Sequence, residues 1–143
     1  MRLLLLPLLT ALLAAPALAS DTTAHRDAGA IGIELNALEA QDGACRLIFV
    51  AENDAGADIA ALVLEAVLFD AEGRVAALTL LDFRDLPAGR MRVRSFDMPG
   101  LECGALERLL INDVAACDWA TEATQDCAAA LSVRSRVDVE LLQ

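Results

Sequence analysis

Short apolar runs separated by turn-forming residues dominate the sequence after residue 30. Seven such runs are expected to form strands, at residues 31–38, 45–51, 62–69, 75–83, 91–98, 106–111 and 131–142. Gly, Asn, Asp and Pro separate the runs, which is typical of an all-β domain rather than of a helical bundle. The pattern therefore predicts an Ig-like antiparallel β-sandwich of about seven strands over residues 31–143.

Three of the runs have distinct patterns. In residues 131–141 the odd positions are mostly apolar and the even positions are polar, which predicts a strand with one buried and one solvated face. Residues 45–50 are apolar on both faces beyond Arg46, as expected of a central strand. Residues 59–68 are rich in alanine, and their periodicity also permits a helix. Val63, Val67 and Phe69 favour a strand there.

Two connections carry turn chemistry. Asp70 can accept hydrogen bonds from its own backbone, and Gly73 can adopt the left-handed conformation, which together predict a hairpin between the third and fourth runs. Pro87 and Gly89 predict a second hairpin, between residues 75–83 and 91–98.

This second hairpin has a testable register. Leu81 would face Val93, Phe83 would face Met91, and Asp82 would face Arg92 on the other side. The core face would then consist of Ala77, Leu81, Phe83, Met91 and Val93, with Thr79 opposite Ser95. A slip of one residue would bury arginines, so the burial pattern opposes it.

The first nineteen residues form a secretory signal pattern. Met1-Arg2 precedes an apolar run that ends in Ala17-Leu18-Ala19, which predicts cleavage between Ala19 and Ser20. We therefore expect a signal peptide at 1–19, a flexible tail at 20–30 and no membrane anchor after cleavage. The expected location is periplasmic or secreted.

The charge balance limits the classes of partner. The chain has 22 acidic and 11 basic residues and a formal net charge of −11, which becomes one unit more negative when Arg2 leaves with the signal. Such a surface repels phosphate backbones and anionic lipids, so nucleic acid and membrane surfaces are not expected partners. It could attract a basic partner or a divalent cation.

All four cysteines follow the predicted cleavage site. Four cysteines can form two disulfides in three different ways. If the strands alternate in direction, Cys45 and Cys103 lie at one end of the sandwich and Cys117 and Cys127 at the other. We therefore predict Cys45–Cys103 and Cys117–Cys127. The competing interpretation is a Cys₄ metal site, which the secreted location and the lack of CxxC spacing disfavour.

Two features are candidate partner-binding sites. Arg90, Arg92 and Arg94 alternate along one run and could hold an anion or an acidic partner. The alternative is a solvated face paired with Asp82 and other acids. Trp119 lies within the predicted Cys117–Cys127 loop and could anchor a partner. Its alternative role is to pack on the disulfide and cover that end of the core.

The remaining candidate residues give weak chemical signals. Glu52, Asp54 and Asp58 crowd one loop and are weak candidates for a cation site, although their spacing does not match an EF-hand, so no metal site is assigned. His25 is the single histidine and lies in the predicted tail. Asp82 and Asp85 could be imagined as glycosidase carboxylates, but aromatic residues are scarce. Nucleotide-binding and hydrolase motifs are absent from the sequence. We expect no catalytic residue and no cofactor.

Residues 66–73, Ala-Val-Leu-Phe-Asp-Ala-Glu-Gly, resemble the FxLYD-type module, a small extracytoplasmic Ig-like domain. That family places an aromatic, an aliphatic, an aromatic and an aspartate at the end of a strand, before a glycine turn. Here Ala66 replaces the first aromatic and Phe69 the tyrosine. Asn53 after an apolar strand, and residues 86–89 before another, are also similar to that layout. The resemblance covers residues 31–98 and implies an Ig-like fold.

The whole chain also resembles uncharacterised bacterial secreted proteins labelled as Tat pathway signal sequence domain proteins. The shared features are the Ala/Leu signal, the cysteine that opens the second strand, and Leu109-Leu110-Ile111-Asn112 ahead of a third cysteine. The chain departs from that label because it lacks the arginine pair. This group implies no activity.

The sequence thus favours a non-enzymatic protein-interaction or accessory module with a protein partner in the cell envelope. Its expected contact sites are an exposed strand edge or the Trp119 loop. The alternative is a periplasmic protein that binds a small ligand or a divalent cation.

Overall fold

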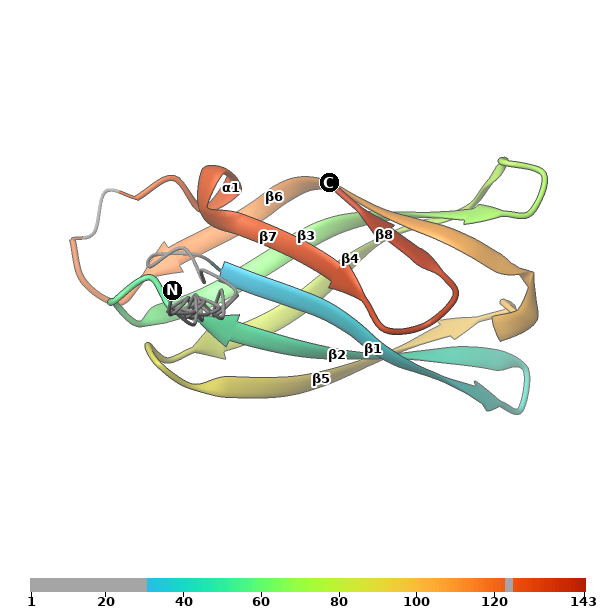
Figure 1. Cartoon of the computed structure of the whole chain (residues 1–143), viewed down its shortest axis with the longest axis horizontal. Coiled ribbons are helices and arrows are strands. Elements are labelled where there is room, and N and C mark those ends of the chain that lie inside the picture. Colours follow the sequence, from blue (N-terminus) through green and yellow to red (C-terminus); the bar gives the residue numbers. More distant parts are fainter. Residues whose placement is uncertain (1–30, 123–124) are drawn as a thin grey trace, which may run out of the picture.

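The structure is a computed structural model that describes residues 31–122 and 125–143. The predicted signal peptide, the predicted tail and His25 lie outside the described residues. Two four-stranded sheets pack face to face, with their strands along the long axis of the molecule (Figure 1). The predicted Ig-like β-sandwich is confirmed.

The first sheet has the strand order β5–β2–β1–β7, and the second has the order β4–β3–β6–β8. The elements, in chain order, are β1 (Ile31–Gln41), β2 (Ala44–Asn53), β3 (Ile59–Asp70), β4 (Val75–Leu86), β5 (Met91–Pro99), the 3₁₀ turn η1 (Cys103–Ala105), β6 (Leu106–Trp119), the single-turn helix α1 (Cys127–Ala130), β7 (Leu131–Ser135) and β8 (Glu140–Leu142). Eight strands thus stand where seven were expected.

The core forms where the inner faces of the two sheets meet. Strand β2 lies between β5 and β1, as its apolar pattern predicts, and its Leu47 and Phe49 are fully buried. Phe49, Phe83 and Phe96 pack edge to face, with ring centroids 5.3 to 5.9 Å apart. These rings come from β2, β4 and β5, so the cluster joins both sheets.

The β3–β4 hairpin forms as predicted, and residues 59–70 are a strand rather than a helix. The Asp70 carboxylate accepts hydrogen bonds from the backbone N–H groups of Glu72 (3.1 Å) and Arg74 (2.8 Å). Gly73 has a φ of 76°, a conformation that glycine adopts without steric cost. Local turn chemistry therefore suffices to specify this hairpin.

The predicted β4–β5 hairpin is wrong. Strand β4 pairs with β3 and strand β5 pairs with β2, so the turn at residues 87–90 carries the chain from one sheet to the other. Leu81 and Phe83 are buried as expected, but Met91 and Val93 point outward and are 56% and 59% exposed. The inward positions of β5 are Arg92, Arg94, Phe96 and Met98, the opposite alternation to the predicted one.

Asn53 explains why this turn crosses between sheets. Its side chain is fully buried, and its amide nitrogen donates to the carbonyls of Ala57 (2.8 Å) and Leu86 (2.7 Å). Its side-chain oxygen accepts from the Ala55 N–H (3.0 Å), and its backbone carbonyl accepts from the Gly89 N–H (2.7 Å). One residue at the end of β2 thus holds both the β2–β3 loop and the β4–β5 turn.

The last predicted run is divided between the two sheets. β7 pairs in parallel with β1, and β8 pairs in parallel with β6, so the sandwich is not wholly antiparallel. The Ser135 hydroxyl bonds the backbone of Val137 and Val139 in the intervening turn. Alternation alone cannot detect the break, because both halves keep their odd residues toward the same core.

Both predicted disulfides are confirmed. Cys45 of β2 is joined to Cys103 of η1, and Cys117 of β6 is joined to Cys127 of α1. The two disulfides close loops of 58 and 10 residues. By restricting the unfolded chain, they should stabilise the fold by about 4 and about 3 kcal/mol respectively. The alternative of a Cys₄ metal site is therefore excluded.

Replacing the Asn53 side chain should destabilise the fold without changing its surface. We expect Asn53→Ala to lower the free energy of unfolding by about 2–4 kcal/mol, because the buried Leu86 carbonyl, the partly buried Ala57 carbonyl and the buried Ala55 N–H lose their partner. Chemical denaturation measures this change. Asn112→Ala is the matched control, because the Asn112 amide donates to Glu65 at the surface (2.6 Å). Equal stability of the two variants would contradict the role of Asn53.

Candidate interaction surfaces

The arginine run on β5 is engaged inside the molecule. Arg94 donates from Nε to the Phe83 carbonyl (2.7 Å) and from a terminal nitrogen to the Asp85 carbonyl (3.2 Å). Arg92 and Arg94 both contact the Asp85 carboxylate at 3.3 Å. Their side chains are only 28% and 20% exposed, so they join the edge of β5 to that of β4. The alternative of a face paired with Asp82 and other acids is thus correct in that an acid pairs with both arginines, but the acid is Asp85 and the face is the inner one.

Arg90 and Asp82 have other positions. Arg90 is exposed in the turn before β5, where its N–H bonds the Pro87 carbonyl (3.2 Å). The Asp82 carboxylate accepts from the N–H of Arg84 (2.8 Å), which has a φ of 59° at an irregularity of β4. A non-glycine residue in this conformation is uncommon, and here the Asp82 hydrogen bond supports it. Asp82 and Asp85 therefore hold the end of this edge strand.

Trp119 packs partly against the core at the end of β6. Its indole N–H donates to the Gln125 carbonyl (3.2 Å), which lies in the loop closed by the Cys117–Cys127 disulfide. The side chain is therefore used to fasten that loop onto the sandwich. This arrangement agrees with a capping role more than with a free aromatic anchor.

The three acidic residues of the predicted cation loop do not converge. Glu52 lies on the outer face beside Arg134 (3.9 Å), Asp58 accepts from the Ala88 N–H (2.8 Å), and Asp54 is exposed. Within residues 31–122 and 125–143, no group of three His, Cys, Asp or Glu side chains is placed to hold a metal ion. The loop is organised by its own hydrogen bonds.

Sequence reasoning missed a charge cluster around Glu34. This carboxylate on β1 is 4% exposed and is covered by Arg134 and by Arg136, whose Nε lies 2.8 Å away. Asn36 also donates to it (2.8 Å). Burial opposes ionisation of Glu34, but the hydrogen bonds from Arg134, Asn36 and Arg136 outweigh it and lower its pKa to about 2. One signal was available: a single acid within the apolar run that opens the domain.

The large exposed apolar residues form two groups, one on each of two edge strands. Five large apolar side chains of the described residues are more than half exposed, namely Val75, Leu78, Leu80, Met91 and Val93. The first three lie on β4 and the other two on β5, which are the neighbouring edge strands of the two sheets. The two groups lie on the outer faces of different sheets, and residues 76–79 lie beside residues 97–101 rather than beside Met91 and Val93. The β5 group was missed because Met91 and Val93 were assigned to the core.

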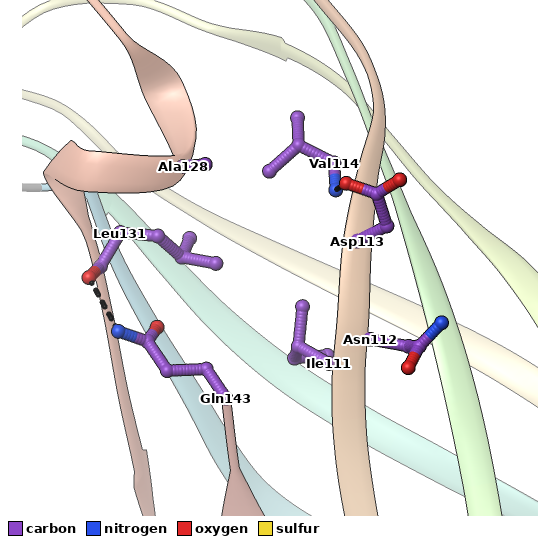
Figure 2. A pocket seen from close by; sticks show the side chains of 7 residues that line it. All are labelled: Ile111, Asn112, Asp113, Val114, Ala128, Leu131 and Gln143. Atoms are coloured by element: carbon purple, nitrogen blue, oxygen red, sulfur yellow. Dashed lines mark hydrogen bonds between the residues drawn. The ribbon is translucent and has the colours of Figure 1, made fainter.

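A pocket of about 310 Å³ lies on the opposite side, where α1 covers the gap between β6 and β7. Figure 2 shows Ile111, Val114 and Leu131 around the cavity, whereas Asn112 and Asp113 point away from it. Gln143 closes one side through a hydrogen bond to the Leu131 carbonyl (3.0 Å). The polar groups that line it do not converge on its interior, so it offers little to orient a small ligand.

Removing the Arg94 side chain should loosen the contact between the two sheet edges. We expect Arg94→Ala to lower the free energy of unfolding by about 1–3 kcal/mol, since two β4 carbonyls lose their donor. Arg94→Lys should lie in between, because one ammonium cannot reproduce the guanidinium fork. Urea denaturation provides the measurement. Arg90→Ala is the control, and an equal loss there would show that the bridge is unimportant.

Lowering the pH should remove the contribution of Glu34. Its pKa falls from 4.5 to about 2 on folding, so the folded state binds fewer protons. Its stabilisation is therefore complete above about pH 5 and is lost as the pH falls toward 2. Glu34→Gln should reduce stability at neutral pH by at most about 3 kcal/mol and flatten the acid limb of the stability curve.

Urea titrations at several pH values test this expectation. Glu39→Gln, exposed on the same strand, serves as the control and should retain the full acid slope. Asp70 and Asp97 also have lowered pKa values, through the backbone hydrogen bond from Arg74 and the side-chain hydrogen bond from Arg46. Both remain in each variant. An unchanged slope in Glu34→Gln would refute the assignment.

Comparison with known proteins supports the fold alone. No family model matches the chain, and no curated protein matches it. A helix long and apolar enough to cross a membrane is not found in the part of the chain that the structure describes. Among solved structures, that of IrmA from Escherichia coli is similar, with 10% identity and a TM-score of 0.55, covering 73% of this chain and 90% of IrmA. The chain therefore shares a sandwich fold with IrmA.

Proposed function

We propose that the chain is a secreted, non-enzymatic β-sandwich that acts as a protein-interaction or accessory module of the cell envelope. The observation that carries the proposal is that each of two edge strands exposes large apolar side chains, Val75, Leu78 and Leu80 on β4 and Met91 and Val93 on β5. Grouped exposed apolar residues are typical of contact sites, and edge strands can accept a partner strand.

The outer face of β5 is the part best suited to a different protein. Val93 lies beside Val50 of β2, and Met91 lies beside Glu52, whose carboxylate is 3.9 Å from Arg134. Methionine adapts its shape to varied partners. A partner with an apolar anchor would fit this patch.

The location follows from the signal pattern and from the cysteines. The two disulfides fit an extracytoplasmic compartment, where such bonds persist. The apolar run at residues 3–19 supports export with cleavage after Ala19, and we infer a periplasmic or secreted protein. The resemblance of residues 66–73 to FxLYD-type modules agrees with this inference.

Crosslinking in living cells, followed by mass spectrometry, tests the proposed function. We expect one reproducible envelope protein with the wild-type chain and its loss with the double variant Met91→Asp/Val93→Asp, because two charges would be buried at the contact. Ala40→Asp adds a charge to an exposed position of β1 and should retain the partner. Recovery of no protein above background, or equal recovery with the double variant, would reject the β5 contact.

A further inference from the structure

The outer face of the second sheet carries an apolar row that crosses all four of its strands. The register places Val67 of β3 between Leu78 of β4 and Leu110 of β6, and it places Leu142 of β8 beside Leu110. These residues alternate with inward-facing neighbours, so they point away from the first sheet. Because adjacent strands lie about 4.8 Å apart, the row is about 14 Å long. We call Leu78, Val67, Leu110 and Leu142 the outer row.

The outer row has a covered centre and an exposed end. Val67 is 8% exposed although it does not belong to the core cluster, so its neighbours on the outer face cover it. Phe69, two residues further along β3, is partly exposed and also lies outside the core. Leu78 and Leu80 at the β4 end are 62% and 57% exposed. Apolar side chains grouped in this way on a surface are typical of a contact site.

Acidic side chains border one side of the outer row. Glu65 of β3 lies between Leu80 of β4 and Asp113 of β6 in the register. The Glu65 carboxylate accepts from the Asn112 amide (2.6 Å), and the Asp113 carboxylate accepts from the Val114 N–H (2.8 Å). Both donors are neutral, and within residues 31–122 and 125–143 neither carboxylate forms an ion pair with an arginine. Two negative charges on this border are therefore uncompensated.

The opposite border of the outer row has balanced charge. There Phe69 pairs with Arg108 of β6, whose Nε lies 3.2 Å from the carboxylate of Glu140 on β8. The face is thus apolar along the row, acidic on one side and neutral on the other. This asymmetry restricts both the chemistry and the orientation of a partner.

We propose that this face binds a protein segment that is both apolar and basic. Its apolar side chains would lie on the outer row, and its Lys or Arg side chains would reach Glu65 and Asp113. The inference rests on the proposed function, because it names the partner chemistry of an interaction module. Burial of apolar area stabilises the contact, and the carboxylates select a basic partner over an acidic one.

Two other occupants match the charges less well. A second copy of the chain would present the same two carboxylates on this face, and its Arg108 is already paired with Glu140. An anionic bilayer would be repelled by Glu65 and Asp113. The experiments below distinguish all three occupants.

An NMR titration of the purified protein with synthetic peptides tests the inference. We expect an amphipathic helix of Leu and Lys to bind and to shift the amide signals of Val67, Leu78 and Leu110. A Leu/Glu helix of the same pattern and a Ser/Lys peptide of the same charge should each bind at least about tenfold more weakly, because each lacks one half of the required chemistry. Shifts confined to other surfaces, or equal binding of the Ser/Lys peptide, would overturn the proposal.

Isosteric variants test the acidic border. Glu65→Gln/Asp113→Asn should weaken binding of the Leu/Lys peptide several-fold, because the amides keep an acceptor oxygen but lose the charge. Glu39→Gln/Asp42→Asn removes the same charge from exposed positions at the end of β1 and in the turn after it, and it should bind like the wild type. Equal weakening by the two variants would show that binding follows net charge alone and would reject this site.

Leu78→Ser/Leu80→Ser tests the apolar end of the face. We expect the Leu/Lys peptide to bind about tenfold more weakly, with thermal unfolding used to verify the fold. Unchanged affinity would overturn this inference and leave the β5 contact standing. Conversely, peptide binding without any crosslinked envelope protein would support this face and reject the proposed function.

The same leucine variant identifies the other occupants. We expect the wild-type protein to be monomeric in sedimentation equilibrium and not to cosediment with phosphatidylglycerol vesicles. A dimer that Leu78→Ser/Leu80→Ser abolishes would assign the face to a second copy. Vesicle binding that the variant abolishes would assign it to a bilayer. Either result would overturn the proposal.

Discussion

The passage of the chain from one sheet to the other at Asn53 determines the surface of this molecule. The Asn53 amide holds the end of β4 and its backbone carbonyl holds the turn before β5, so these two strands cannot form a simple hairpin. β5 must then pair with β2, with Phe96 turned inward toward the other phenylalanines. Because Phe96 of β5 points inward, Arg92 and Arg94 on the same face also point inward, and Met91 and Val93 point outward.

The chain contains no lysine, and its arginines have two different structural roles. Arg94 supplies donors to carbonyls at the end of an edge strand, where a neighbouring strand would otherwise supply them. Arg134 and Arg136 instead cover and neutralise the Glu34 carboxylate on the outer face of the first sheet. In both cases the planar guanidinium makes several directed bonds at once, which an ammonium group cannot do.

Local signals in the sequence predicted the local structure correctly. The Asp70–Gly73 turn, the central strand β2 and the two disulfides follow from turn chemistry, apolar patterning and the alternation of strand direction. The wrong prediction of a β4–β5 hairpin has a physical cause. A turn sequence indicates that the chain reverses, but it does not indicate whether the next strand joins the same sheet. Both alternations of β5 place some apolar residues inward, and only the contact of Phe96 with the core decides between them. The division of residues 131–142 escaped detection for a similar reason, because a change of sheet leaves the alternation intact.

The parallel pairing of β1 with β7 has a consequence for the order of folding. Glu34 and Arg134 are 100 residues apart in the chain, yet they are neighbours across these strands. The first strand thus gains its second neighbour only after nearly the whole domain has been synthesised. Such long-range closure is slow, because a large loop must be ordered before the contact is made. A folding chain would therefore pass through a stage in which its first strand is paired on one edge alone, with its other edge open to incorrect pairing.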